Sequence, residues 1–312
     1  MLSLIVPVYK NEANIPSLLE AIAGIRKQVE GDFEAVFVVD GSPDHSHFVL
    51  ARELPTAAFN AQLLSLSRNF GAFAAIRAGL EAAKGDYITV MAADLQEPPE
   101  LILQMYQAMK NDQCDVAYGE RLRRDDPWAT RILSQAFWRL YRRVAIPDIP
   151  QGGVDIFGCT REVRDQIMRL GERNSSLVGL LFWIGFRRKG IPYDRAEREI
   201  GKSAWTFAKK WKYMQDSMFS FSDLPITMLI AVGAFGLMFS VVLATIVLAS
   251  ALFGQLDVPG YAATMMVILF LGMLQILSMG VLGIYLWRIF ENTKGRPLHV
   301  IMSSQSYGGS DK

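Results

Sequence analysis

The sequence predicts an α/β domain with a mostly parallel sheet, followed by two membrane-spanning helices. Over about the first 120 residues, apolar β-prone runs alternate with segments whose apolar residues recur every three or four positions, as in strands that alternate with helices. Farther along, residues 226–254 and 258–287 contain no charged residue, and each run exceeds the roughly 20 residues that span a bilayer. Two buried core helices are the alternative, but core helices rarely run so long without a charge.

The α/β part contains five expected strands joined by helices. Strands that alternate with helices form a parallel sheet that is covered on both faces. The helical segments carry Leu, Ile, Met and Ala at the spacing that packing against a sheet requires. The expected strands are 2–8, 33–39, 61–66, 87–92 and 115–118, and the expected helices are 14–29, 47–53, 71–83 and 100–110.

Composition narrows the class of protein. The 312 residues carry a net charge of +1, so bulk charge gives no reason to expect nucleic-acid binding. Cys114 and Cys159 are isolated thiols, which fits a reducing compartment and no disulfide framework. The first residues lead directly into a strand, so no cleavable signal peptide is expected.

The charges around the apolar runs predict the membrane topology. Cations lie before the first run and after the second, whereas the connector 255–260 has none. The positive-inside rule then places both termini and the α/β domain in the cytoplasm, in a multi-pass protein of the cytoplasmic (inner) membrane. The flanking cations are Lys209, Lys210, Lys212, Arg288, Lys294 and Arg296.

Two further segments combine basic and aromatic residues. Residues 121–145 hold seven arginines among aromatic and aliphatic residues, and residues 203–221 place aromatic and apolar residues on one stripe with lysines on the other. Both are typical of amphipathic helices that lie at a membrane interface. The alternative in each case is a solvated helix whose apolar stripe packs on the core.

The strand expected at 87–92 leads to a carboxylate, Asp94. An acid at the carboxyl end of a parallel strand lies where open α/β sheets bind ligands, and there it could hold a metal that bridges a nucleotide diphosphate. The alternative, equal in weight when this segment is taken alone, is a helix N-cap, because Pro99 and Glu100 open the next helix.

Three other strand ends carry polar loops that contain glycine or proline. Asp40 could accept hydrogen bonds from a base or ribose, with Gly41 allowing close approach, although an Asx turn that caps the next helix is an equal alternative. Together with the Asp94 segment, these loops describe one crevice. The loops are 7–12, 40–44 and 68–71.

These loops, in this order, resemble those of family 2 glycosyltransferases of the GT-A fold. More narrowly, they resemble the polyprenyl-phosphate branch, which includes dolichol-phosphate mannosyltransferases and bactoprenol glucosyltransferases. The resemblance covers nearly the whole chain. The matching segments are Ile5–Glu12, Val39–Asp44, Arg68–Gly71, Ala93–Glu100, Gly119–Arg121, Trp183–Phe186, Arg198–Ser203, Phe219–Ser222, Gly283–Phe290 and Lys294–Pro297.

The resemblance implies a membrane-bound inverting enzyme that moves a sugar from a nucleotide-diphosphate sugar to a polyprenyl (undecaprenyl-type) phosphate, for cell-surface glycan synthesis or modification. Membrane lipids are further expected partners, and a homo-oligomer is compatible with the sequence. The implied organisation is a GT-A catalytic domain at 1–200 with an acceptor segment at 121–145, a juxtamembrane helix at 201–224, transmembrane helices at about 226–253 and 261–287 within 225–290, and a cytoplasmic tail at 291–312.

The resemblance also implies roles for single residues. Asp94 and Gln96 would hold a divalent cation, Mg²⁺ or Mn²⁺, on the donor diphosphate. Asp155 would position the acceptor or act as a base, and a buried cap or salt-bridge partner is the alternative. The nucleotide sugar would meet Pro7, Tyr9, Glu12, Asp40, Asp94, Gln96, Arg198 and Lys202; the acceptor phosphate would meet Arg121, Arg124, Arg131 and Ser134; and the catalytic set would be Asp94, Asp155, Arg121 and Arg131.

Two residues depart from the family pattern. Val39 stands where most relatives have an acidic or amide residue, and Ala92 replaces the first aspartate of Asp-x-Asp. One carboxylate and one amide make a poorer site for a hard cation than two carboxylates. Either the metal is held mainly by the substrate, or cationic side chains replace part of its role, or catalysis is lost. The last case would leave a nucleotide-sugar-binding or scaffold protein on the same fold, and a transferase with a different lipid acceptor is a further alternative.

Overall fold

The structure, a computed structural model of the chain, describes residues 1–122, 138–150, 153–172, 175–196, 207–252 and 260–308. The chain forms two compact units. The first comprises Met1–Tyr213 together with Arg296–Lys312, and the second is Met214–Gly295. The segment after residue 295 therefore belongs to the first unit, whereas the sequence suggested a separate tail from residue 291.

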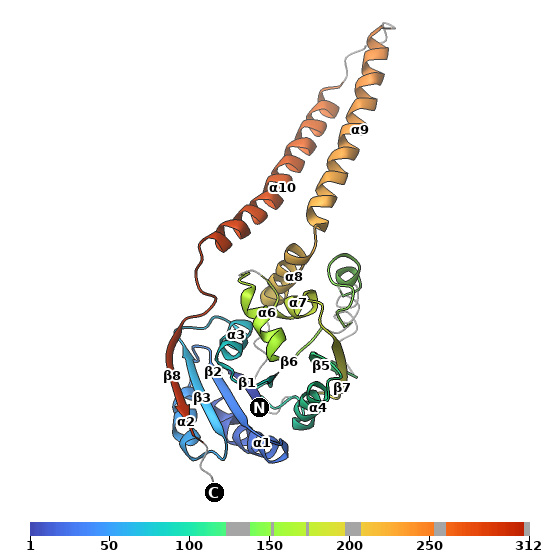
Figure 1. Cartoon of the computed structure of the whole chain (residues 1–312). Helices are drawn as coiled ribbons and strands as arrows, with labels where there is room; N and C mark the ends of the chain where they lie inside the picture. Colours follow the sequence, from blue (N-terminus) through green and yellow to red (C-terminus); the bar gives the residue numbers. More distant parts are fainter. Residues whose placement is uncertain (123–137, 151–152, 173–174, 197–206, 253–259, 309–312) are drawn as a thin grey trace. The chain divides into compact units, whose positions relative to one another are not determined.

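The first unit is built on a mixed, mostly parallel eight-stranded sheet with the order β7-β5-β6-β4-β1-β2-β3-β8 (Figure 1). β1 pairs in parallel with β2 and β4, β2 with β3, and β5 with β7, whereas β6 and β8 run antiparallel to their neighbours. The strands are β1 (Leu2–Val8), β2 (Phe33–Val39), β3 (Asn60–Leu66), β4 (Tyr87–Val90), β5 (Val116–Arg121), β6 (Phe157–Thr160), β7 (Arg188–Tyr193) and β8 (Ile301–Tyr307).

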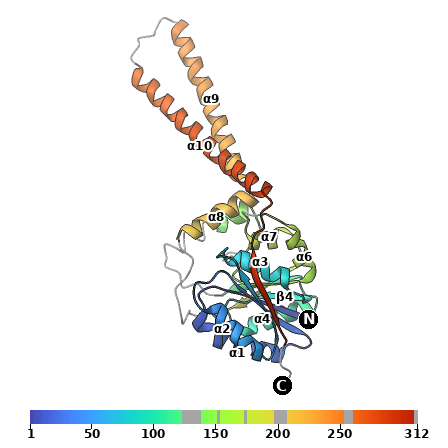
Figure 2. The ribbon, with the colours of Figure 1, turned by 90° about the vertical axis from the view of Figure 1, so that its left-hand side faces the viewer.

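Helices cover both faces of this sheet. α1, α2 and α4 lie on one face, and α3 and α6 lie on the other (Figures 1 and 2). β1 and β2 are buried along almost their whole length, which explains their continuous apolar runs. The helices and short 3₁₀ turns of this unit are η1 (Glu12–Asn14), α1 (Ile15–Gln28), α2 (Ser46–Glu53), η2 (Leu54–Thr56), α3 (Ala72–Ala82), α4 (Pro99–Lys110), α6 (Arg161–Arg169) and α7 (Leu177–Trp183).

The five expected strands and the four expected helices between them are confirmed, with ends that differ by a few residues. The sequence analysis missed β6, β7 and β8. β6 is only four residues long, and β8 is a largely exposed strand of mostly polar residues at the edge of the sheet, so neither has the apolar pattern of a buried strand.

A buried carboxyl group, that of Glu34, accepts hydrogen bonds from polar groups near the amino ends of the strands. Glu34, 4% exposed, accepts hydrogen bonds from Ser3 Oγ (2.5 Å), Gln62 Nε2 (2.9 Å) and the backbone N–H of Lys84 (2.7 Å). Because buried polar groups need such partners, this network fixes the loop before β4 against the sheet. This edge of the sheet therefore has a structural function.

The second unit consists of long helices. Within the described residues, the stretch Phe270–Thr293 is long and apolar enough to cross a membrane, and a pair of helical segments bent by 75°, Met214–Phe221 and Leu224–Gly236, would count as a second span if taken together. Helices thus lie at both expected positions, and one or two spans of membrane length are found among the described residues. The helices are α8 (Phe207–Phe221), which begins in the first unit, α9 (Leu224–Leu252) and α10 (Tyr261–Thr293).

A polar contact joins the end of α8 to α10 within this second unit. Arg288 donates to Asp216 Oδ1 (2.7 Å) and to Ser220 Oγ (3.0 Å), and its guanidinium lies over the ring of Phe219. Along α9 and α10, large apolar side chains are exposed, including Phe235 and Phe270. Contiguous apolar surface of this kind marks a surface that contacts a membrane or a partner.

Candidate active site

The parallel strands β1 to β4 end at one edge of the sheet, and hydrogen bonds link the loops that follow them. The backbone N–H of Glu12 donates to Asp44 Oδ2 (3.2 Å), and Glu12 Oε2 accepts from the N–H of His45 (3.0 Å). Glu12 therefore ties the loop after β1 to the loop after β2. Pro7 and Tyr9, which are also expected at the nucleoside, are half-buried at the same edge.

Asp40 organises the loop between β3 and α3. Its side chain is 2% exposed, and its two carboxylate oxygens accept from the N–H groups of Phe70 (2.7 Å) and Gly71 (2.8 Å). Gly41 has a φ of +54°, and a Cβ there would lie 2.3 Å from the carbonyl carbon of Arg68, so only glycine fits. The close approach at Gly41 is thus to the protein's own backbone, and nucleoside binding by Asp40 stays a prediction.

Asp94 lies in a strained loop rather than at a helix start. α4 begins at Pro99 with Pro98 as its cap residue, so the alternative of an N-cap role for Asp94 is wrong. The next residue, Leu95, has a φ of +56°. A left-handed conformation costs a residue with a side chain about 1–2 kcal/mol, and such strain gathers at functional sites. The half-buried carboxylate of Asp94 therefore lies in a backbone turn that the surrounding structure must hold in place.

The residues after Asp94 bind the segment that follows β7. The backbone N–H of Ala196 donates to the Gln96 carbonyl (3.0 Å), and Gln96 Nε2 donates to the Ala196 carbonyl (3.2 Å). Arg195 Nη2 donates to Gln96 Oε1 (2.6 Å), and Arg195 Nε lies 3.7 Å from Glu97 Oε1. The Arg195 guanidinium thus has the Gln96 amide and the Glu97 carboxyl as neighbours.

Glu97 is an acid enclosed by the protein. It is 1% exposed, and Oε2 has no hydrogen-bond partner among the described residues. Burial raises the pKa of the Glu97 carboxyl to about 7; the charge of Arg195 lowers it, whereas Asp94 and Asp155 raise it further. The pKa of Glu97 therefore depends on the charges of both the Asp94 loop and the Asp155 cluster.

Asp155 is held by two residues from neighbouring strands. Arg121, at the end of β5, forms an ion pair with Asp155 Oδ2, and the Tyr193 hydroxyl, at the end of β7, donates to the same oxygen (3.1 Å). Arg121 and Tyr193 are register partners in the parallel β5–β7 pair. Burial, and then the charge of Asp155, raise the pKa of the Tyr193 phenol, so it stays a neutral donor. The contacts of Asp155 thus agree with the alternative reading of this residue as a salt-bridge partner. Its partner is Arg121, the residue that was expected to meet the acceptor phosphate.

Three residues that the sequence analysis missed interact with the expected site residues. Arg195 contacts Gln96, Tyr193 contacts Asp155, and the pKa of Glu97 depends on the charges of Asp94, Asp155 and Arg121. Glu97 was adjacent to a predicted residue and could have been noticed. Tyr193 and Arg195 had no sequence signal, because their place depends on the β5–β7 pairing, which was not predicted. Five expected site residues lie outside the described part of the chain: Arg124, Arg131, Ser134, Arg198 and Lys202.

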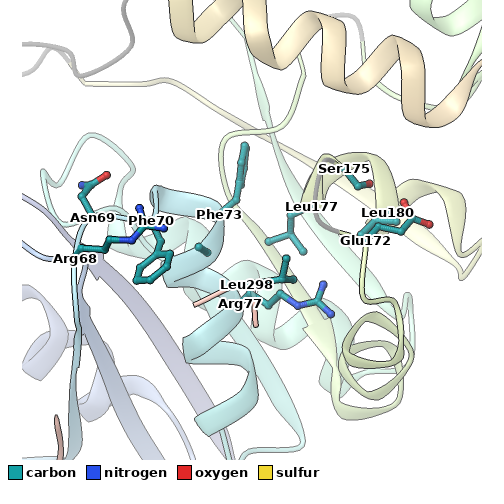
Figure 3. Close-up of a pocket in the computed structure, with 11 residues that line it drawn as sticks. Arg68, Asn69, Phe70, Phe73, Arg77, Glu172, Ser175, Leu177, Leu180 and Leu298 are labelled. Atoms are coloured by element: carbon teal, nitrogen blue, oxygen red, sulfur yellow. The ribbon is translucent and has the colours of Figure 1, made fainter. Parts of the chain in front are cut away.

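A separate pocket of about 320 Å³ lies beside the β3–α3 loop (Figure 3). Its arginines are already engaged: Arg68 stacks on Phe70, and Arg77 donates to the carbonyls of Ile167 and Met168 at the end of α6. The pocket is lined in part by Arg68, Asn69 and Phe70 of the loop 68–71, which the sequence analysis expected at the crevice. The residues to which the resemblance gave individual roles do not line it.

The expected metal ligands do not fit a hard divalent cation. Ca²⁺ and Mg²⁺ prefer several oxygen ligands, with carboxylates foremost. Ala92 offers none, and Gln96 Oε1 already accepts from a guanidinium. Among the described residues, no three His, Cys, Asp or Glu side chains lie together as metal ligands would. Of the two aspartates in the family's Asp-x-Asp pattern, this chain keeps only Asp94.

The raised pKa of Glu97 predicts a pH-dependent stability. Because the pKa rises from 4.5 to about 7 on folding, the stabilising effect of this protonated carboxyl is fully present below pH 4.5 and is lost as pH rises through about 7. We therefore expect Glu97→Gln to melt at a higher temperature than the natural protein near about pH 8 but at a similar temperature near about pH 5. Tryptophan fluorescence in detergent with EDTA measures the melting temperatures of both proteins at each pH. An equal difference at the two pH values would contradict the assignment.

Two solved structures of glycosyltransferases match part of this chain at low sequence identity. Glucosyl-3-phosphoglycerate synthase from Mycobacterium tuberculosis, in complex with Mn²⁺, uridine diphosphate and phosphoglyceric acid, is 14% identical with a TM-score of 0.47, over 69% of this chain and 75% of that chain. The mannosyltransferase from Pyrobaculum calidifontis, in complex with GDP-mannose and Mn²⁺, is 19% identical with a TM-score of 0.43, over 61% and 54%.

Similarity in sequence extends over almost the whole chain. An uncharacterized glycosyltransferase of Synechocystis is 33% identical over 96% of this chain and 94% of its own length. The bactoprenol glucosyl transferase of Shigella phage SfII is 32% identical over 97% and 98%. The model of the family described as glycosyl transferase family 2 matches residues 3–169. The chain therefore belongs to glycosyl transferase family 2, and it is a glycosyltransferase with a GT-A-like α/β unit.

Proposed function

We propose that this glycosyltransferase is a membrane protein that transfers a sugar, with inversion, from a nucleotide-diphosphate sugar to a polyprenyl phosphate. The observation that carries the proposal is the similarity over 97% of the chain, long C-terminal helices included, to a protein named bactoprenol glucosyl transferase. The Asp94 loop and the Arg121–Asp155–Tyr193 cluster supply the polar groups that such a reaction needs at the carboxyl edge of the sheet.

This reaction requires that the acceptor phosphate be positioned, and it does not require a strong general base. A phosphate monoester has a second pKa near about 6, so the acceptor is mostly ionised at neutral pH. One of its oxygens attacks the anomeric carbon while the bond from that carbon to the diphosphate breaks on the opposite side. Arg121, held by Asp155, presents a forked guanidinium that suits a phosphate. Asp155 then serves to orient Arg121, with Tyr193 fixing the carboxylate.

Chain connectivity supports a hairpin of two spans. β8 follows α10 in sequence, yet it pairs with β3 in the sheet that contains the N-terminal strand. If the helices of the second unit cross a membrane, the chain must therefore cross an even number of times to return to this sheet. We propose two crossings, by α9 and α10, with the α/β unit in the cytoplasm, and the cations that flank these helices support this orientation.

A labelling experiment tests this topology. In a background with Cys114→Ser and Cys159→Ser, Gln255→Cys should react with a membrane-impermeant maleimide in right-side-out vesicles, because the connector lies outside. Ser304→Cys, on an exposed position of β8, should react only in inverted vesicles. Reaction of both cysteines from the same side would contradict the hairpin.

Transfer itself is tested with the purified full-length chain, a polyprenyl phosphate and a panel of radiolabelled nucleotide sugars. We expect a lipid-linked monosaccharide with at least one donor. A parallel reaction with diacylglycerol as the acceptor tests whether the enzyme uses a lipid without a phosphate instead. Nucleotide binding without any product from the full panel would favour the binding or scaffold function that Ala92 leaves open.

Arg121→Ala should lower kcat/KM for the lipid phosphate by about a hundredfold and change the Kd of the nucleotide less than about threefold, because the arginine meets the acceptor. Arg121→Lys should recover only part of the loss, since it keeps the charge but loses the fork. Arg52→Ala, on an exposed pair in α2, is the matched control. A weaker nucleotide Kd with unchanged acceptor kinetics would overturn this role.

A further inference from the structure

We propose that Arg195 supplies, at the donor diphosphate, positive charge that two-carboxylate enzymes obtain from a divalent cation, so that this enzyme binds its nucleotide without a metal. The inference rests on the proposed function, because it assumes a diphosphate donor. The family pattern implies a metal site, but the residues present at this position do not fit one. The inference follows from this disagreement.

The first step is the identity of the groups around the expected metal position. Ala92 removes one carboxylate, and Gln96, which would have been the second protein ligand, gives its Oε1 to Arg195 Nη2 at 2.6 Å. A metal ion at Gln96 would have to displace this guanidinium. A cation therefore already lies at this point of the site, and it is a side chain.

The second step is that the Arg195 guanidinium is held in place while some of its N–H donors have no hydrogen-bond partner among the described residues. Its side chain is 28% exposed. Nε is buried without a hydrogen-bond partner among the described residues, since Glu97 Oε1 is 3.7 Å away, and Nη1 donates to no described residue. An arginine has five N–H donors in a fixed fork. Nη1 can therefore donate to an anion without breaking the contact between Nη2 and Gln96 that positions the guanidinium.

The third step is the match between this cation and its ligand. Gln96 lies two residues after Asp94, so Arg195 lies at the loop where a donor diphosphate is expected. Guanidinium forks bind phosphate oxygens in pairs, and fixed cations stabilise the charge that develops on a leaving diphosphate. Glu97 Oε1, 3.7 Å from Arg195 Nε, adds a second polar group beside the guanidinium. The loss of a carboxylate at residue 92 and the presence of an arginine beside Gln96 then compensate for each other.

Isothermal titration calorimetry with the full-length protein in detergent tests the inference. UDP and GDP are titrated in EDTA and, separately, in Mn²⁺. We expect the natural protein to bind one of them with a Kd that differs less than about threefold between the two conditions. Arg195→Ala should weaken binding in EDTA at least about tenfold, and Arg195→Lys should weaken it less. Arg195→Gln, which keeps a long polar stem beside Gln96, is the second variant if the alanine variant does not fold.

A gain-of-function variant sharpens the test. In the double variant Arg195→Ala with Ala92→Asp, nucleotide binding should return only when Mn²⁺ is present, because a second carboxylate then stands beside Asp94. Arg52→Ala should bind as the natural protein does. Binding that EDTA abolishes in the natural protein, with Arg195→Ala unchanged in Mn²⁺, would overturn this inference and leave the proposed function intact. Failure of every nucleotide in both conditions would overturn both.

Discussion

Burial of the parallel strands on both faces is the constraint on which the rest of the structure depends. Because helices cover both faces of β1 and β2, an unpaired polar group within these strands would be costly. In β1 and β2 the buried polar side chains, Ser3 and Glu34, therefore lie near the amino ends of the strands. Near the amino ends, the buried Glu34 network satisfies them internally. At the edge where the parallel strands end, Asp94 and Gln96 lie in the loop after β4, and Asp155 lies in the loop before the antiparallel β6.

The same constraint explains which parts of the fold could be predicted. Strands that are buried on both faces are continuous apolar runs, so β1 to β4 were visible in the sequence, and so were the amphipathic helices between them. β6 and β8 could not be recognised from a local pattern, because the first is very short and the second lies exposed at an edge. The pairing of β8 with β3 also depends on the chain returning after the long helices, which no local pattern records.

The candidate site was predicted in part for the same reason. Residues directly after predicted strands, such as Asp94 and Gln96, could be identified from their position alone. Tyr193 and Arg195 follow β7, whose place beside β5 is a tertiary feature, so their neighbours could not be predicted. Asp40 shows the converse: the residue was correctly seen at a strand end, but its oxygens bind the backbone of the next loop. Strand-end position predicts where a residue lies better than it predicts what the residue contacts.

The central claim is that the donor diphosphate binds at the carboxyl ends of β1 and β4, against Arg195. A cryo-EM or crystal structure of the full-length protein with a bound nucleoside diphosphate, prepared in EDTA, tests it most directly. The account predicts diphosphate oxygens within hydrogen-bonding distance of the Arg195 guanidinium and beside the Asp94 loop. A nucleotide bound in the pocket beside Arg68, or a diphosphate at the Asp94 loop with Arg195 turned away from it, would contradict the account.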